Sequence, residues 1–260
     1  MTRSVSKRSS WGIHAAQVGI VALIALGWEL FPHLGILTAN TFPPLSRAIT
    51  TILTDHLFAR HALTSIGRAY GGLTAAILVG LPLGLLLGGW FNRFQQALEP
   101  LMELFGQANP VILSHIVVLF FGIGTGTQLF VISWLSIWPI SFSAINGVRS
   151  VDPQILKMAA SLGIGRWQLF TRVILPSAAP AIITGIRLSA GYAFIMLIAA
   201  ELMGATTGLG YVMATSAETA DMNSLAAAAL VVTILALTTD LFLKQAGKRL
   251  VVWRYQGGVD

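Results

Sequence analysis

The chain has 260 residues, of which 55% are hydrophobic and only 10% are charged. A soluble domain carries about a quarter charged residues, so this composition excludes an ordinary soluble protein and indicates an integral membrane protein. The net charge of +6 could suggest a nucleic-acid partner, but the distribution of the basic residues along the chain explains it without one.

Six stretches are long and apolar enough to cross a membrane, which takes about 20 residues. They cover residues 12–31, 62–90, 101–121, 128–148, 182–204 and 225–243. The first follows a basic arm, but its apolar part is too long for a signal peptide and no small-residue cleavage site precedes Pro32. The predicted fold is therefore an all-α polytopic membrane protein with six transmembrane helices, the first of them retained.

The basic residues predict the orientation of these spans. With the N-terminus in the cytoplasm, most of them fall on the cytoplasmic side: Arg3, Lys7, Arg8, Arg93, Arg149, Lys157, Arg166, Arg172, Lys244, Lys248, Arg249 and Arg254. Arg47, Arg60 and Arg68 are left on the opposite side. This distribution follows the positive-inside rule and predicts that both termini are cytoplasmic.

The segment between the first two spans predicts a short helix at the membrane surface. Pro43 and Pro44 favour an extended entry, and Ser46 is suited to cap a helix that contains Arg47 and Arg60. In the second span, small residues recur at every fourth position, which lets another helix approach closely. These residues are Gly72, Ala76, Gly80, Gly84 and Gly88. We expect helix packing there rather than chemistry.

No motif of an enzyme is visible. The phosphate-binding pattern Gly-x4-Gly-Lys-Ser/Thr is absent, and residues 122–127 are glycine-rich but lack the lysine and a preceding strand. Clustered His and Cys ligands and the pattern Gly-x-Ser-x-Gly are absent too. The sequence therefore predicts a protein that transports or binds rather than one that catalyses.

Residues 157–176 form a basic, amphipathic connection between the fourth and fifth spans. Asp152 and Pro153 are suited to start a helix, and Gly163 and Gly165 to break it. A second short helix is expected to carry Arg166, Trp167, Leu169, Phe170 and Val173 and to end at Leu175 and Pro176. Because tryptophan, phenylalanine and arginine dominate binding hot spots, the loop is either a docking surface or an interfacial helix with its aromatic rings at the lipid headgroups.

Polar residues inside the spans are candidates for a pathway or gate. His115 lies near the middle of the third span, where an ionisable ring is costly unless it faces a cavity or a partner. Asn109, before Pro110, could break that span and leave a free carbonyl, or only kink it. Arg187 is expected to snorkel to the cytoplasmic end. Glu201, about 21 Å further along the fifth span, either lines an outer gate or anchors the following loop.

Gly163, followed ten residues later by the run Val-Ile-Leu-Pro that ends at Pro176, resembles the EAA loop of ATP-binding-cassette (ABC) importer permeases. The resemblance covers residues 41–253 and includes Pro110, residues 121–124, 138–140, Gly147, 185–188, Ala200, Glu201 and 208–211. These landmarks are similar to the branch that imports sulfonates, taurine, nitrate, bicarbonate or thiamine precursors. Two features depart from that branch: Lys157 replaces the first glutamate of the loop, and Ser114 and His115 stand where Trp and Pro are more usual.

The resemblance implies a type I permease fold, with an N-terminal arm and first span over 1–40, a permease core over 41–253 and a cytoplasmic tail over 254–260. It implies a homodimer in a bacterial inner membrane, two separate ATPase subunits beneath it, and a periplasmic or lipid-anchored substrate-binding protein. ATP and magnesium would be bound by the ATPase, so this chain would need no cofactor of its own. The implied coupling residues are Lys157, Ala159, Gly163, Gly165, Arg166, Trp167, Phe170, Leu175 and Pro176.

Two other functions stay open. A secondary transporter or channel driven by an ion gradient could relay protons through His115 or Glu201, but it has no use for a basic aromatic docking loop. A membrane enzyme acting on lipids would need a catalytic constellation that the sequence lacks. The loop therefore favours the importer permease, whereas the cargo stays undetermined because the binding protein does most of the selecting.

Overall fold

The computed structural model describes residues 8–34 and 42–250, and in these ranges the chain forms helices joined by short connections, with no strand. The helices are α1 (Arg8–His33), α2 (Leu45–Thr54), α3 (His56–Gly89), α4 (Asn92–Gly106), α5 (Pro110–Phe121), α6 (Thr125–Arg149), α7 (Pro153–Ser161), α8 (Arg166–Leu169), η1 (Phe170–Ile174), α9 (Leu175–Gly204), α10 (Leu209–Glu218) and α11 (Met222–Leu250). The predicted all-α class is confirmed. The domain boundary at 40/41, the tail 254–260, Arg3, Lys7 and Arg254 lie outside the described residues.

Four of the described helices are long and apolar enough to cross a membrane: α3, α6, the continuous helix Arg166–Gly204 and α11. The bent pair formed by α4 and α5 gives a fifth if it counts as one span. The apolar part of α1, Gly19–His33, is shorter than the 18 residues required of such a helix. The prediction of six spans is therefore met at four positions, or five with the bent pair.

The predicted third span is wrong as a straight helix. Its two halves, Arg93–Gly106 and Val111–Phe121, meet at an angle of 91°. Asn109 is extended (φ −66°, ψ 124°), as expected before a proline, and its side chain accepts the backbone N–H of Val111 at 2.9 Å. Its carbonyl accepts the N–H of Leu113 at 2.9 Å, so the carbonyl that we expected to be free is used by α5.

The helix predicted between the first two spans is shorter than expected. It ends at Thr54, and Asp55 caps α3 by accepting the N–H of Leu57 at 2.8 Å. Because Asp55 caps it, the second span begins at His56 and not at residue 62. Asp55 was not recognised as a helix cap in the sequence. Ser46 does not cap α2. Its N–H and hydroxyl donate to the two carboxylate oxygens of Glu29 at 3.0 and 2.7 Å and tie α2 to α1.

The small-residue stripe of α3 packs against α6, as predicted. A Cβ atom on Gly84 would lie 2.6 Å from the carbonyl oxygen of Ser141, and one on Gly80 would lie 2.9 Å from that of Ile137. The hydroxyl of Ser141 donates to the carbonyl of Gly80 at 3.0 Å across the same contact. Glycine thus allows the two helices to approach closely enough for a serine hydroxyl on α6 to donate to the backbone of α3.

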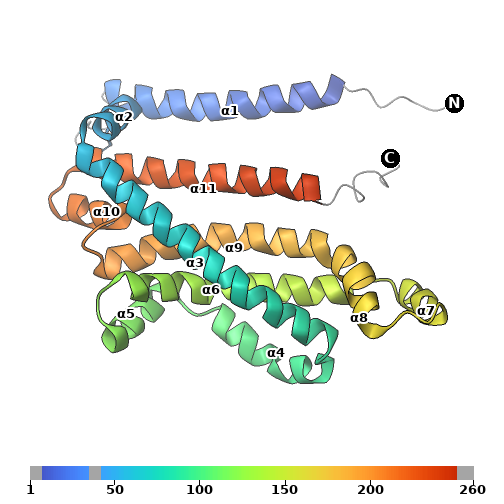
Figure 1. Cartoon of the computed structure of the whole chain (residues 1–260). Helices are drawn as coiled ribbons and strands as arrows, with labels where there is room; N and C mark the ends of the chain where they lie inside the picture. Colours follow the sequence, from blue (N-terminus) through green and yellow to red (C-terminus); the bar gives the residue numbers. More distant parts are fainter. Residues whose placement is uncertain (1–7, 35–41, 251–260) are drawn as a thin grey trace.

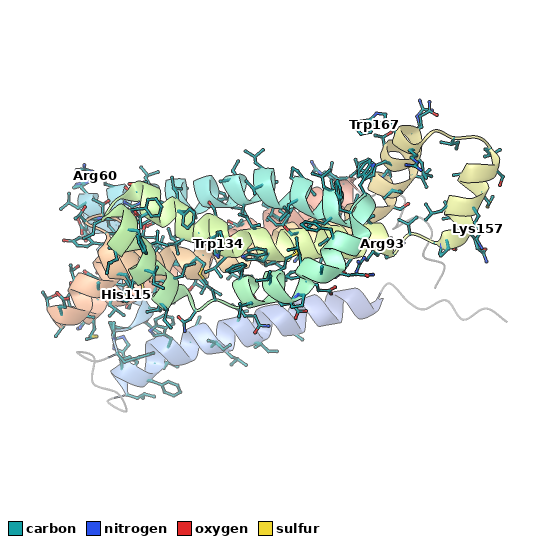
Figure 2. All side chains as sticks on the ribbon, turned by 90° about the horizontal axis from the view of Figure 1, so that it is seen from below. Arg60, Arg93, His115, Trp134, Lys157 and Trp167 are labelled. Atoms are coloured by element: carbon teal, nitrogen blue, oxygen red, sulfur yellow. The ribbon has the colours of Figure 1, made fainter. Side chains whose placement is uncertain are left out.

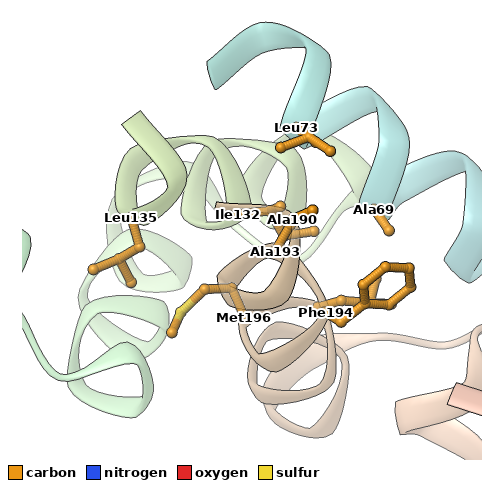
Figure 3. Close-up of a cluster of buried hydrophobic side chains, with 9 residues drawn as sticks. Ala69, Leu73, Ile132, Leu135, Ala190, Ala193, Phe194 and Met196 are labelled. Carbon is orange, nitrogen blue, oxygen red and sulfur yellow. The ribbon is translucent and has the colours of Figure 1, made fainter. Parts of the chain in front are cut away.

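The core lies where α6 packs between α3 and α9 (Figure 3). Its buried members are Ala69, Leu73, Ile132, Leu135, Ala190, Ala193, Phe194, Met196 and Leu197. Alanines on α3 and α9 alternate with large side chains, so the three helices interlock at short range.

The remaining helices surround this core (Figure 1). In that view α1 and α11 lie on one flank, and α4 and α5 lie on the opposite flank. The helices α2, α5 and α10 gather at one end of the bundle, while α7, α8, the start of α1 and the end of α11 gather at the other. Figure 2 shows Arg60 at the first end and Arg93, Lys157 and Trp167 toward the second. The structure therefore separates these basic residues as the sequence predicted.

Candidate functional site

The loop between α6 and α9 projects beyond the end of the bundle (Figure 1). Asp152 starts α7 as predicted, by accepting the backbone N–H of Gln154 at 2.8 Å. After α7, Gly163 adopts the left-handed conformation (φ +68°), which a residue with a Cβ atom rarely takes up. Gly165 then caps α8. The two glycines reverse the chain so that α8 heads back toward the bundle.

The short helix after the turn does not end at Leu175 and Pro176, which corrects the prediction. Arg166–Gly204 is one continuous helix, interrupted only by the π-helical turn η1. In that turn the N–H of Leu175 bonds to the carbonyl of Phe170, five residues earlier. Pro176 has no N–H to give to a helical ladder, and the wider turn before it accommodates the proline without breaking the helix. A motion of α8 is therefore carried directly into α9.

The predicted coupling residues differ in how much of each is exposed. Trp167 is 70% exposed at the start of α8, and Lys157, Gly163, Gly165 and Arg166 are exposed as well. Ala159 is buried, while Leu175 and Pro176 are half-buried. The accessible surface of the loop therefore includes only part of the predicted set, and Met158 and Leu162 add to it.

Phe170 is buried against the end of α3. Its ring centroid lies 4.5 Å from that of Trp90, which follows α3, and 6.2 Å from that of Trp167. The row Trp167, Phe170 and Trp90 connects the exposed face of α8 to α3. Phe170 therefore packs against the end of α3 and is not part of the exposed surface of the loop.

Glu201 lies in a buried network at the opposite end of the bundle. Its carboxylate accepts the hydroxyl of Ser65 at 2.8 Å, the guanidinium of Arg68 at 2.8 Å and the backbone N–H of Gly210 at 2.8 Å. Glu201 is 1% exposed and Arg68 is 6% exposed. A buried charge is tolerated when it is paired with an opposite charge and hydrogen-bonded, and the Glu201 carboxylate meets both conditions.

The same network holds the loop between α9 and α10. Arg68 donates to the backbone and the hydroxyl of Thr207, and the hydroxyl of Ser65 accepts the N–H of Leu209 at 2.7 Å. Gly208 donates its N–H to His61 at 3.0 Å and adopts φ +121°, where a Cβ atom would overlap the Glu201 carboxylate. Of the two roles left open for Glu201, these contacts favour the anchor of the loop.

Sequence reasoning missed Ser65 and Arg68 as partners of Glu201, and His61 as the partner of Gly208. Arg68 was assigned only to a side of the membrane. The sequence did contain a signal for this pair. Arg68 lies within a predicted span, and a buried arginine needs an acidic partner at the same depth in another helix.

Arg187 has a partner on α11. It donates to the Asp240 carboxylate with N–O distances of 2.7 to 3.0 Å, and both side chains are partly exposed. The expected snorkelling to the headgroups is replaced by this ion pair, which ties α9 to α11. Asp240 was overlooked because it lies within a predicted span without a charged neighbour in the sequence.

His115 and Asn109 belong to α5 and do not join the other candidates through any described contact. His115 is exposed, and its Nδ1 lies 2.7 Å from the carbonyl of Val111 one turn earlier. Asn109 caps the same helix. Figure 2 places His115 away from Trp134 on the neighbouring α6. Among the described residues, no group of three or more potential ligands is placed to hold a metal ion.

A feature that the sequence did not reveal is a cavity of about 400 Å³ between α4, α6 and α9. Its lining residues come from the last turn of α4, the middle of α6 and the middle of α9: Glu103, Gly106, Gln107, Trp138, Pro139, Phe142, Ser143, Leu188 and Tyr192. The bend between α4 and α5 is what brings the end of α4 to this depth.

The family follows from a comparison with known proteins. Residues 80–252 match the family described as binding-protein-dependent transport system inner membrane component. The chain belongs to this family. It is a multi-pass inner-membrane permease component of a transport system, in line with the resemblance described above.

Curated relatives are permease proteins of ABC importers. The chain is 31% identical to the taurine transport system permease protein TauC of Escherichia coli (strain K12), over 91% of this chain and 88% of that protein. It is 30% identical to the putative aliphatic sulfonates transport permease protein SsuC of Bacillus subtilis (strain 168), over 91% and 87%. It is also 30% identical to the formylaminopyrimidine transport permease protein ThiX of Halalkalibacterium halodurans, over 81% and 84%.

Solved structures confirm the type I importer permease fold. The permease superimposes on a chain of the inward-facing MetNI methionine ABC transporter with a TM-score of 0.66, at 16% identity, over 75% of this chain and 94% of that one. A bacterial ABC transporter that imports alginate gives a TM-score of 0.61 at 18% identity, over 93% and 96%. At these identities the likeness concerns the fold alone.

Proposed function

We propose that this permease subunit works as a homodimer whose two copies enclose the translocation pathway of a bacterial ABC importer, and that it couples to a separate ATPase through the loop between α7 and α9. The observation that carries the coupling is the position of Trp167, exposed at the tip of a helix that runs without a break into α9. A docked ATPase that moves this tip would move a whole span.

The proposed mechanism is alternating access. ATP binding closes the ATPase dimer and displaces α8. The displacement passes into α9 through η1 and into α3 through the rings of Phe170 and Trp90. Because a ligand shifts an equilibrium only by its difference in affinity for two states, ATP must favour an outward-open packing of the spans that is less stable without it. Hydrolysis then restores the inward-facing packing.

The proposed orientation follows the basic residues. The end that carries Arg93, Lys157 and Arg166 lies in the cytoplasm, where the positive-inside rule places it, and both termini lie on that side. The end formed by α2, α5 and α10 faces the periplasmic or lipid-anchored binding protein.

Lys157 cannot take over the role of the usual glutamate, so the partner ATPase is expected to present an acidic residue at this position. ATP and magnesium are held by that ATPase.

The cargo is proposed to be a small organic molecule. The relatives named above carry taurine, aliphatic sulfonates and formylaminopyrimidine, which differ in charge and in the presence of an aromatic ring. A proton-relay role for Glu201 finds no support, because its carboxylate is already bonded to Arg68, Ser65 and Gly210.

The first test is capture of the tagged chain from native membranes in a mild detergent. A stoichiometric partner with a phosphate-binding loop is expected.

In the same complex, Trp167→Ala is expected to lower cargo uptake by about tenfold or more, because a tryptophan at the centre of an interface is typically a hot spot. Leu23→Ala, at an equally exposed site on α1, on the flank away from the cavity, is the control and should transport normally. Capture of the chain alone, or normal uptake by Trp167→Ala, would contradict the proposal.

A further inference from the structure

The cavity between α4, α6 and α9 lies at the depth where a pathway needs a passage for cargo. Trp138 and Pro139 occupy the middle of α6, and Glu103 lies in the last turn of α4. The cavity is on the flank that carries α4, opposite α1 and α11 (Figure 1).

An exposed carboxylate identifies what this flank faces. Glu103 lines the cavity at the level of the middle of α6, and its side chain is exposed. A carboxylate exposed to hydrocarbon at this depth is strongly unfavourable, so a membrane protein turns such a group toward water or toward another protein surface. On the proposed homodimer, that surface is the pathway between the two copies.

Aromatic side chains continue from this cavity toward the end that carries α5. They lie along α6 at every fourth position and are joined by rings from α4 and α5; we call this row the aromatic track. Its members are Phe121, Phe130, Trp134, Trp138, Phe142 and Phe105. Neighbouring rings from Phe121 to Trp138 have centroids 5.7 to 6.0 Å apart.

The aromatic track connects two hollows. A second one of about 390 Å³, lined by Phe121, Gly124, Gly126, Thr127 and Phe130, lies at the turn between α5 and α6. The structure therefore offers flat, stackable faces from the end of the bundle to its middle. Aromatic rings attract other rings and cations, whereas their negative faces disfavour anions.

The polar groups of the cavity point to the same class of cargo. Glu103 is the only charged residue among those that line it, and no Lys, Arg or His is among them. Gln107 and Tyr192 add hydrogen-bonding groups that are exposed. Trp138 borders the cavity with its ring, because its indole N–H is buried. An occupant that carries donors for Glu103 and a flat ring satisfies the groups that the cavity exposes.

We propose that this cavity is a transit site for a planar, amino-substituted heteroaromatic molecule, neutral or cationic, and that aliphatic sulfonates are not the cargo. This inference rests on the proposed function, because it needs the α4 flank to face the pathway. A sulfonate would place its negative charge beside Glu103 without a cation in the lining to offset the repulsion. An amino-substituted ring instead stacks on the aromatic track and donates to the carboxylate.

The test measures binding to the purified full-length chain in lipid nanodiscs, without ATPase or binding protein. Saturation-transfer NMR detects weak binding and compares cytosine, a flat amino-substituted ring, with ethanesulfonate, an aliphatic sulfonate without a cationic group. Benzenesulfonate, a flat anion, separates the effect of the ring from that of the charge. Cytosine is expected to bind more tightly than benzenesulfonate, and ethanesulfonate is expected to give no signal.

Variants locate the site. Glu103→Gln removes the negative charge and keeps the shape, so it is expected to weaken cytosine binding about fivefold by loss of charge-assisted hydrogen bonding. Trp138→Ala removes a ring that borders the cavity and is expected to weaken cytosine binding as well. The matched control is Glu99→Gln, one turn earlier on α4 and outside the cavity lining, which should bind cytosine like the parent chain.

Ethanesulfonate binding as tight as cytosine binding would overturn the inference, and so would equal cytosine binding by the Glu103 and Glu99 variants. Absence of binding by both probes would overturn it too. None of these results bears on coupling to an ATPase, which partner capture and Trp167→Ala test separately.

Discussion

Glu201 shows how a charge is kept inside a bundle of apolar helices. Its carboxylate is paired with Arg68 and receives further hydrogen bonds from Ser65 and Gly210, so neither charge is left without a partner. The pair joins α9 to α3 and fixes the first turn of α10. The functional consequence is a rigid connection at the end of the bundle proposed to face the binding protein.

Glu201→Ala would leave the Arg68 guanidinium buried without its counter-charge. We expect a loss of about 3 kcal/mol in the free energy of unfolding, as for other broken buried pairs. The melting temperature in detergent, followed by tryptophan fluorescence, measures the effect. Glu218→Ala, an exposed glutamate at the end of α10, is the control and should change stability by less than about 0.5 kcal/mol. Equal stability of the two variants would refute the anchoring role.

The helices show where local sequence signals were sufficient and where they were not. Pro110 correctly marked a break, but the 91° bend that makes α4 and α5 two helices depends on how both halves pack against α6. Pro176 suggested a break that does not exist, because a π-helical turn before it absorbs the missing hydrogen bond. The same residue type therefore gave opposite outcomes in two settings.

Close approach of α3 and α6 depends on glycine at particular positions. Gly84→Ala would place a methyl group 2.6 Å from the carbonyl oxygen of Ser141 and 2.7 Å from the Cβ of Ala144. We expect a loss of about 1 to 3 kcal/mol in unfolding free energy, as for an overpacked core, again measured by thermal unfolding.

The matched control on the same helix is Gly67→Ala. A Cβ atom there meets nothing within 4 Å, and alanine is the better helix former by about 0.5 to 1 kcal/mol. It should therefore leave stability unchanged or raise it. A Gly84 variant as stable as the Gly67 variant would show that the two helices can move apart without cost.

The whole molecule is a three-helix core with two different flanks and two different ends. One flank carries α1, joined to the rest by the bonds of Glu29 to Ser46 and by the indole of Trp28, which donates to the carbonyl of Pro43 at 3.0 Å. The other flank carries α4, α5 and the cavity. This asymmetry is what a subunit needs if one side contacts lipid and the other encloses a pathway.

Accessibility of single cysteines tests the orientation of the bundle, because the natural chain contains no cysteine to interfere. In spheroplasts, a membrane-impermeant maleimide should label Arg60→Cys and leave Lys157→Cys unlabelled until the membrane is permeabilised. Both parent residues are exposed and lie at opposite ends. The reverse labelling pattern would place the loop outside the cell and exclude coupling to a cytoplasmic ATPase.

The sequence by itself determined the helical class, most of the spans, the grouping of basic residues and the small-residue contact of α3. Each follows from composition or from a pattern within one segment, and such patterns act locally. It also predicted a coupling loop by resemblance to a family, and the comparison confirmed the family.

Only the tertiary structure decided which polar residues meet. The contact between Arg68 and Glu201 joins positions 133 residues apart, and that between Arg187 and Asp240 joins positions 53 apart. The cavity likewise needs α4, α6 and α9 together. No local pattern encodes such meetings, because they depend on the depth and rotation of each helix, which packing against its neighbours sets.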